Sequence, residues 1–212
     1  MSVQTSKKMI RMLKHISVLC FSAVLMGLGI DLFLNAGLGS DAITTLVEGI
    51  SILSGWNVSV CNFLFNITVM IVVALLHRPY VGIGSFLYML ICSVGMRVWS
   101  VFIPDASGLF ARIICYLTGL LVMTVAIALN TPCDYGKNAY DAFCLLMSER
   151  TKLKFATIRM ICDAIMLISG ILMGGAYGIG TIISIFAIGR IAGFMIPKVR
   201  SNPWLRRYME LD

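Results

Sequence analysis

Residues 109–129 read LFARIICYLTGLLVMTVAIAL, an apolar run in which Arg112 is the one charged side chain. A helix needs about 20 predominantly apolar residues to cross the hydrocarbon core of a bilayer, so this stretch predicts a transmembrane helix. Five further runs of similar character occupy most of the remaining chain: Ile16–Leu34, Val58–Leu76, Val81–Phe102, Phe155–Met173 and Gly178–Ile196. Six crossings and their connections account for nearly all 212 residues. The sequence therefore predicts an all-α integral membrane protein with no room for a separate soluble domain.

The composition points to the same class. Charged residues make up 13% of the chain and hydrophobic residues 59%, whereas soluble domains carry about 25% charged residues. We therefore expect the lipid bilayer as the surrounding medium. The formal net charge is +7, but the basic residues lie at the ends of apolar runs instead of forming one stripe, so we expect no nucleic-acid partner. Most of the seven cysteines lie in apolar runs and none forms a Cys-x-x-Cys pair, so we expect no disulfide framework, no metal site and no cofactor.

Basic residues lie in alternate connections of this topology. They are Lys7, Lys8, Arg11 and Lys14, then Arg78, then Lys137, Arg150, Lys152 and Lys154, and finally Lys198, Arg200, Arg206 and Arg207. The other three connections contain Asp41, Glu48 and Asp105 but no Lys or Arg. Cytoplasmic loops carry the excess of Lys and Arg. The pattern therefore predicts a cytoplasmic basic N-terminus at 1–15 and a cytoplasmic basic tail at 198–212.

Two parts of the chain resemble each other. Residues 79–85 read PYVGIGS and residues 176–181 read AYGIGT, so a Tyr, a Gly-Ile-Gly and a hydroxyl recur in order. A pair of polar residues four positions apart precedes each copy at a similar distance: Asn62 and Asn66 in the first, Arg159 and Asp163 in the second. Further upstream, Asn35 and Asn130 end corresponding spans, and Asp41-Ala42 and Asp141-Ala142 open two short polar helices at 40–53 and 138–148. The alternative is that Gly-rich helix turns look alike by chance.

Duplication implies a specific architecture. Each unit would hold a span, a short polar helix and two more spans, over residues 16–103 and 109–197. Because three crossings are an odd number, the two copies must be inserted upside down relative to each other. We therefore predict six transmembrane helices arranged as two inverted three-helix repeats. Inverted repeats are a recurrent architecture of secondary transporters, whose sites lie near the midplane where the repeats meet.

Polar side chains inside the spans are candidates for that site. Arg159 and Asp163 are four apart and therefore share a helix face, and Asn62 and Asn66 are the matching pair. Ionisable residues within a span are costly and usually mark function, so Arg190 is a further candidate. The alternative is structural: Arg159 and Asp163 form a neutralised pair that fixes packing, or Arg159 reaches the cytoplasmic interface by snorkelling.

The starts of the two short helices add Asp41 and Asp141 to the candidates. Gly, Ser, Asp and Asn precede both helices, as helix starts require, because the first backbone N–H groups have no internal partner. If these helices dip into the membrane, their positive ends face a polar or anionic ligand. If they lie flat at the interface, they are amphipathic connectors. The sequence leaves both options open.

The stretch Asn35-Ala36-Gly37-Leu38-Gly39-Ser40-Asp41 and the motif Gly178-Ile179-Gly180-Thr181 resemble those of the YczE-like bacterial membrane proteins, which are grouped with the YyaS and YitT proteins. The resemblance covers essentially the full chain. It implies a bacterial inner-membrane protein with a transport-related function, and it supplies neither a substrate nor site residues. Where that family often has Pro followed by a bulky residue, this chain has Ser40-Asp41, so no role for Asp41 follows from the family.

Together these patterns predict a small secondary transporter of a polar or anionic small molecule, with Arg159, Asp163, Asn62 and Asn66 at the binding site and Arg190 as a counter-charge. The alternative is a membrane-embedded binding or assembly subunit, which would act in a homodimer or with a partner subunit. The chain contains no Gly-x-Ser-x-Gly, His-Glu-x-x-His or phosphate-loop motif, so we expect no enzyme and no catalytic residues.

Overall fold

The computed structural model describes residues 3–103, 106–133 and 138–209, and its elements are all helical. The α-helices are α1 (Val3–Ala36), α2 (Ala42–Ser54), α3 (Val58–Leu76), α4 (Ile83–Phe102), α5 (Leu109–Asn130), α6 (Ala139–Thr151), α7 (Phe155–Leu172), α8 (Ile179–Ser201) and α9 (Pro203–Met209). A short 3-10 helix, η1 (Arg78–Tyr80), joins α3 to α4. No β-strand occurs in the described ranges.

Six of these helices, α1, α3, α4, α5, α7 and α8, are long and apolar enough to cross a membrane. The predicted spans are thereby confirmed, with boundaries that shift by a few residues except at the start. There α1 begins at Val3, well before the predicted Ile16. Its 34 residues correspond to a length of about 50 Å at 1.5 Å per residue, which exceeds the roughly 30 Å hydrocarbon core. The basic N-terminal segment is therefore largely a continuation of the first helix.

Both short helices form where the sequence predicted them. The side chain of Asp41 caps α2 by accepting a hydrogen bond from the backbone N–H of Ile43 at 3.2 Å, and α2 ends at Gly55, whose φ is +70°. Asn138 precedes α6. The sequence did not predict α9, which folds back so that the backbone carbonyl of Met209 lies 2.8 Å from Nε2 of His15 on α1.

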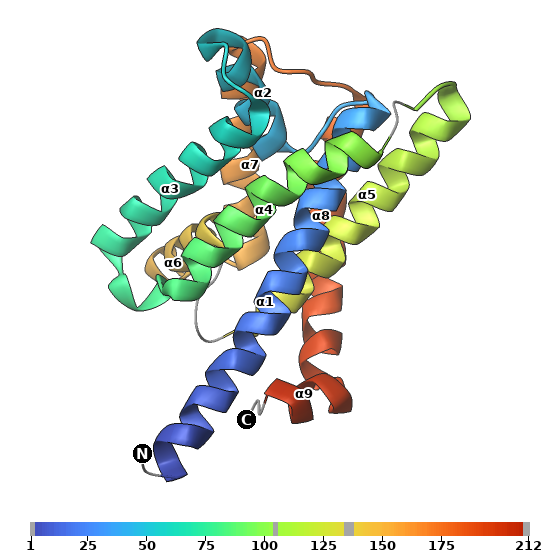
Figure 1. The fold of residues 1–212 in the computed structure, drawn as a ribbon. Coiled ribbons are helices and arrows are strands. Elements are labelled where there is room, and N and C mark those ends of the chain that lie inside the picture. The colour runs from blue at the N-terminus through green and yellow to red at the C-terminus, as the bar shows by residue number, and fades with distance from the viewer. Residues whose placement is uncertain (1–2, 104–105, 134–137, 210–212) are drawn as a thin grey trace.

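The chain has two halves, α1–α4 and α5–α8, and helices of each half pack against helices of the other. The first spans of the halves, α1 and α5, pack against each other (Figure 1). Each also contacts the last span of its own half, α1 with α4 and α5 with α8. Each short helix contacts the middle span of the opposite half, α2 with α7 and α6 with α3. Residues from both halves therefore meet in the interior.

Glycines allow the closest of these approaches. A Cβ added to Gly27 on α1 would lie 2.9 Å from the backbone oxygen of Cys92 on α4, and one added to Gly119 on α5 would lie 3.1 Å from the backbone oxygen of Gly29 on α1. Small residues permit such contact in a bilayer, where helix association depends on packing because lipid offers no hydrophobic drive. The large apolar core lies around this crossing of α1, α4, α5 and α8.

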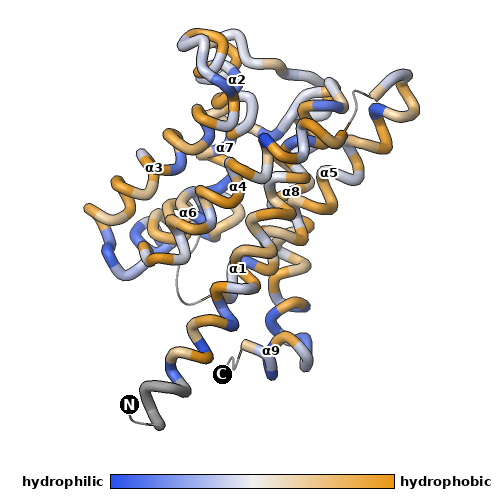
Figure 2. Tube along the Cα trace, viewed as in Figure 1, coloured by the Kyte–Doolittle hydropathy of each residue, from blue (hydrophilic) through white to orange (hydrophobic). Residues whose placement is uncertain are grey.

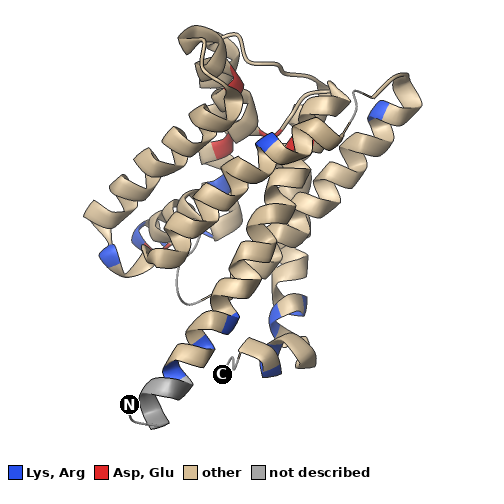
Figure 3. Ribbon diagram, viewed as in Figure 1, with Lys and Arg blue, Asp and Glu red and all other residues tan. Residues whose placement is uncertain are grey.

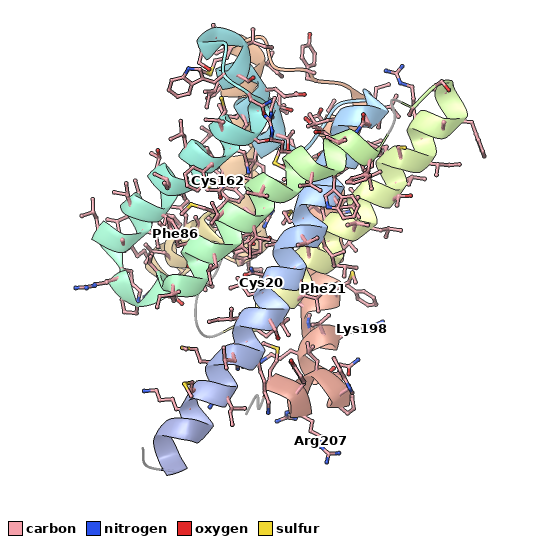
Figure 4. The ribbon with its side chains drawn as sticks, viewed as in Figure 1. Cys20, Phe21, Phe86, Cys162, Lys198 and Arg207 are labelled. Carbon is pink, nitrogen blue, oxygen red and sulfur yellow. The ribbon has the colours of Figure 1, made fainter. Side chains whose placement is uncertain are left out.

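The outer surface is as apolar as lipid contact requires. Leu75 and Leu172 each expose 82% of their surface, and Phe21 and Phe86 are likewise exposed on α1 and α4 (Figure 4). Hydrophobic residues run along most of each long helix (Figure 2). Exposed apolar surface this extensive is incompatible with a monomer in water. The chain is thus a multi-pass membrane protein.

Charged residues are distributed unevenly between the two ends of the molecule. Many Lys and Arg lie near the end that holds the start of α1 and the helix α9 (Figure 3), and Lys198 and Arg207 are placed there (Figure 4). The start of α1 and α9 share this end of the molecule (Figure 1), as six crossings require. Of the residues used to predict the orientation, Asp105 and Lys137 lie outside the described ranges, as do the outermost parts of both predicted tails, residues 1–2 and 210–212.

Candidate functional site

Arg159 is the centre of a buried charge cluster. It is the fifth residue of α7, and 6% of its surface is exposed. Its Nη1 donates to Oδ1 of Asp141 on α6. Its Nε lies 3.8 Å from Oδ2 of Asp163, one helical turn further along α7. The expected sharing of one helix face by Arg159 and Asp163 is therefore observed, but the closer ion pair joins Arg159 to Asp141 of the short helix.

Tyr140 provides a second polar contact between α6 and α7 in this cluster. Its hydroxyl donates a hydrogen bond to Oδ1 of Asp163, and the Arg159 guanidinium lies 5.3 Å from the centre of its ring. Asn138, at the start of α6, donates through Nδ2 to Oδ2 of Asp141 at 3.4 Å. Charges buried away from water persist only when they are paired and hydrogen-bonded. These contacts meet that requirement in large part for Arg159 and for both of its carboxylate partners.

Asp41 joins the cluster from the first half of the chain. Its carboxylate accepts hydrogen bonds from the Thr44 hydroxyl and from the backbone N–H of Ile43, and 7% of its surface is exposed. Within the described residues no Lys or Arg forms an ion pair with it. Asp41 lies between α1 and α2, outside the six spans, and burial raises the pKa of its carboxyl although Thr44 and Arg159 act in the opposite direction.

The two asparagines of α3 occupy the position in the first half that Arg159 and Asp163 occupy in the second. Asn62 is the fifth residue of α3, as Arg159 is of α7. Its Nδ2 donates to the hydroxyl of Ser93 on α4 at 3.2 Å. Nδ2 of Asn66 donates to the backbone oxygen of Asn62 at 2.8 Å and to its Oδ1 at 3.3 Å. The pair therefore forms a polar strip on an otherwise apolar helix.

A small internal cavity lies where these groups meet. Both halves line it, with polar groups from Asp41, Asn62, Asn66, Tyr88, Asn138 and Arg159. Its volume is ≈ 40 Å³, enough for about two or three water molecules. A second cavity of ≈ 10 Å³ is also lined by Asp41 and Arg159, together with Asp163 and Ser184. Asp41 and Arg159 therefore border two small polar spaces.

Tyr88 and Arg159, which both line the larger cavity, each have one buried polar atom without a hydrogen-bond partner in the described part of the chain: the Tyr88 hydroxyl and Nε of Arg159. Tyr88 is 2% exposed, so bulk water does not reach it. An unpaired buried polar group costs about 1–3 kcal/mol. A bound water, ion or substrate with polar atoms would supply the missing hydrogen-bond partners.

A larger groove of ≈ 550 Å³ between α3 and α4 is not comparable to this site. Apart from Ser59, Ser93 and Arg97, aliphatic and aromatic side chains line it. It lies on the outer surface of two membrane-spanning helices, where acyl chains would fill it. No set of polar groups converges there.

The structure brings together six of the seven candidate residues predicted from sequence. Asp41, Asn62, Asn66 and Arg159 line the larger cavity, Asp163 lines the smaller one, and Asp141 reaches them through Arg159. Arg190 is not brought in, because its side chain is exposed on α8 and lines neither cavity.

Sequence reasoning missed Tyr88 and Tyr140. Both are aromatic residues within or beside apolar helices, where a lipid-facing or core role is the usual expectation. The one available signal was that Tyr140 occupies the place before Asp141 that Ser40 occupies before Asp41.

Comparison with known proteins shows the family of the chain. The model of a family of unknown function, DUF6198, matches residues 13–197. An uncharacterized protein of Haemophilus influenzae is 28% identical over 190 residues, which cover 90% of this chain and 87% of that protein. The uncharacterized protein YyaS of Bacillus subtilis is 23% identical over 84% of this chain and 90% of its own length.

A third relative carries a description of its location. The uncharacterized membrane protein YczE of Bacillus subtilis is 24% identical over 125 residues, which cover 59% of this chain and 58% of that protein. The resemblance to YczE-like proteins is thereby confirmed. No solved structure matches the chain.

Proposed function

Since the chain belongs to DUF6198, a family of membrane proteins whose function is unknown, we propose its function from the site: a small secondary transporter that moves a polar small molecule by alternating access. The observation that carries this proposal is the buried cluster of Arg159, Asp141, Asp163 and Asp41 beside a cavity lined by both halves of the chain. A purely structural ion pair has no need of a polar cavity with unpaired groups at its wall.

The proposal includes an inverted repeat as its mechanical basis. The contact pattern supports it, because exchanging the halves maps each major contact onto another: α1·α4 onto α5·α8, α2·α7 onto α6·α3, and α3·α4 onto α7·α8. The helix starts match too, since the backbone N–H of Gly82 faces the Ser85 hydroxyl at 3.5 Å and that of Gly178 faces the Thr181 hydroxyl at 3.2 Å. Two such halves rocking about a shared site would open it to each side in turn.

The site in this structure is closed to a metabolite. Binding pockets for drug-sized ligands occupy about 300–1,000 Å³, whereas the polar cavity holds ≈ 40 Å³. Transport therefore requires that the helices lining it separate. Because Arg159 already faces two carboxylates, a neutral or cationic substrate fits this site better than the anion that the starts of the short helices suggested.

Orientation in the membrane follows from the distribution of charge. We place the start of α1 and the helix α9 in the cytoplasm of a bacterial cell, because their end of the molecule carries many Lys and Arg (Figure 3). The inner membrane is the corresponding location. A homodimer or a partner subunit would be compatible with this arrangement.

The proposal is tested with the purified protein reconstituted in proteoliposomes. A panel of amino acids, short-chain amines and carboxylates would be screened for flux in the wild type, Asp163→Asn, Asn66→Ala and Arg190→Ala. We expect at least one compound to be transported, a loss of more than tenfold in the first two variants, and near wild-type flux in Arg190→Ala because that residue lies outside the cavities. Equal flux in all four proteins would refute the site. Flux that appears only after a partner subunit is added would favour the assembly-subunit alternative.

A further inference from the structure

The charge cluster carries an excess of negative charge. Three carboxylates, Asp41, Asp141 and Asp163, surround the single guanidinium of Arg159. The starts of α2 and α6 also point into this region and contribute about half a positive charge each. The sum remains negative when all three carboxylates are ionised. An uncompensated buried charge is strongly disfavoured, so either a proton or a cation should complete the cluster.

Of these three carboxylates, that of Asp41 is the one whose negative charge is not balanced by an ion pair in the described residues. Arg159 forms ion pairs with Asp141 and Asp163, whereas Asp41 is held by a hydroxyl and a backbone N–H. Of these three carboxylates, only that of Asp41 lines the larger cavity. A positive guest in this cavity would therefore meet Asp41 directly.

Tyr88 is the independent sign that the cavity holds a guest. Tyr88 lines the same cavity as Asp41, and its buried hydroxyl makes no hydrogen bond to any residue the structure describes. A buried phenol without a partner is rarely retained. Asn62, Asn66 and Thr44 also line this cavity and carry neutral amide and hydroxyl oxygens. Hard oxygen atoms around one carboxylate are the surroundings that a small cation prefers.

We propose that this cavity binds one small monovalent cation, either an inorganic ion or the ammonium group of a substrate, between the carboxylate of Asp41 and the hydroxyl of Tyr88. An anion would meet three carboxylates. A divalent ion would find only one carboxylate at the cavity wall, whereas Ca²⁺ takes six to eight oxygen ligands and Mg²⁺ retains several waters, for which ≈ 40 Å³ is too small. The role of the cation in transport rests on the proposed function, but its binding does not.

Protons should compete with this cation. Burial already raises the pKa of Asp41, so acidic solution would protonate the carboxylate and weaken cation binding. The titratable or charged groups that interact with Asp41 from the surrounding elements are Glu48, Cys92, Tyr116, Arg159 and Asp163. Among them Arg159 is the one cation, and it is shared with Asp141 and Asp163.

The test is the melting temperature of the purified full-length protein in detergent. It would be measured in increasing NaCl, KCl, LiCl or methylammonium chloride, with N-methyl-D-glucamine chloride to keep ionic strength constant. A ligand that binds only the folded state stabilises it by RT ln(1 + L/Kd), where L is the free ligand concentration, so the melting temperature rises with the logarithm of the cation concentration once that concentration exceeds Kd. We expect such a rise with at least one of the four cations at pH 8, and at least a tenfold weaker apparent affinity at pH 5. A response to methylammonium alone would identify the substrate's ammonium group as the guest, and a response to the metal ions alone an inorganic ion.

Two variants and a control make the result specific. Asp41→Asn should abolish the response while it keeps the helix cap, because Asn caps as well as Asp. Tyr88→Phe should weaken the apparent affinity at least tenfold and, without the cation, leave the melting temperature unchanged or higher, since it removes an unpaired buried hydroxyl. Arg190→Ala should respond like the wild type.

The proposal fails if no cation changes the melting temperature of the wild type, or if Asp41→Asn responds equally. It also fails if the wild type is stabilised relative to Asp41→Asn only as the pH falls and not by any cation, which would assign the compensating charge to a proton. These outcomes are separable from those of the transport assay. Flux without a cation effect would support the transporter and refute the cation site. Cation binding without any flux would support the cation site and refute the transporter.

Discussion

Nη1 of Arg159 on α7 donates to Oδ1 of Asp141 on α6, a residue that lies 18 positions earlier in the chain, while Asp163 of the same helix is 3.8 Å away from Nε. The guanidinium therefore ties the short helix of the second half to the span that follows it. Asp41 approaches the same cluster from the first half. One buried side chain thus connects the elements whose relative movement transport would require.

The first prediction concerns that ion pair. Arg159→Met removes the one cation from among three buried carboxylates, and breaking a buried pair in this way costs roughly 3–5 kcal/mol. At about 2–4 °C per kcal/mol for a chain of this size, we expect the melting temperature to fall by about 6–20 °C. Adding Asp141→Asn to Arg159→Met should restore part of the loss. Additive effects of the two changes would contradict the coupling.

Part of this cluster could be predicted from sequence, because some of its residues are close in sequence and share a helix face. Arg159 and Asp163 share a face at a spacing of four, and Asn62 and Asn66 repeat that spacing, so the helical period identified both pairs. The contacts of Asp141 and Tyr88 depend on how α6 and α4 pack on other helices. No local pattern encodes such packing.

The limits of the sequence appear equally in Arg190 and α9. The helix α8 is apolar on most sides, so the sequence could not show that Arg190 faces outward. The seven residues of α9 are too short for a distinct periodic pattern and are held by a tertiary contact to His15. The six long spans were predictable because the thickness of the bilayer imposes their length and composition.

A second prediction concerns Tyr140. Its hydroxyl donates to the buried carboxylate of Asp163, and hydrogen bonds to charged groups contribute about 1.5–3 kcal/mol. Tyr140→Phe keeps the ring that lies against Arg159 and removes only this bond. We expect thermal melting in detergent to report a loss within that range. Tyr177→Phe changes an exposed tyrosine and should leave the melting temperature unchanged, so equal losses in both variants would contradict the assignment.

The third prediction is a dependence of stability on pH through Glu48. This residue lies on α2, outside the six spans, and burial raises the pKa of its carboxyl from 4.5 to about 7. Its Oε2 has no hydrogen-bond partner in the described structure. The folded state therefore holds the proton more tightly than the unfolded state, and the resulting stability is present below pH 4.5 and is lost as the pH rises through 7.

Glu48→Gln should remove this contribution. The variant is expected to melt at the same temperature as the wild type or lower near pH 5, and higher than the wild type at pH 8. The measurement is the difference between the two melting curves across that interval, which cancels the titration of all other groups. Parallel curves with a constant difference would show that Glu48 does not titrate in this range.

A fourth prediction concerns the contact between the two halves at Gly39. Its φ is +100°, and an added Cβ would lie 2.4 Å from Oγ1 of Thr181 and 2.7 Å from the backbone nitrogen of Gly178. Gly55 also has a positive φ, of +70°, but nothing lies within 4 Å of its added Cβ. Gly55→Ala should therefore cost only the roughly 1–2 kcal/mol of a left-handed backbone.

Gly39→Ala should cost clearly more than Gly55→Ala, because a side chain there also pushes the loop after α1 away from the start of α8. The yield and melting temperature of the two purified variants provide the comparison. Similar values would mean that the loop and α8 separate easily.

Alternating exposure of the cavity is tested most directly by chemical labelling of native Cys92, which lines the larger cavity, after the other six cysteines have been replaced. Membrane-impermeant maleimide would be applied to right-side-out and to inside-out vesicles, with a cysteine at the exposed Arg190 position as the comparison. A cavity that opens to each side in turn predicts slow labelling of Cys92 from both sides, with a transported substrate or cation changing the two rates in opposite directions. Labelling from one side alone, or from neither side under any condition, would contradict a transport site between the two halves.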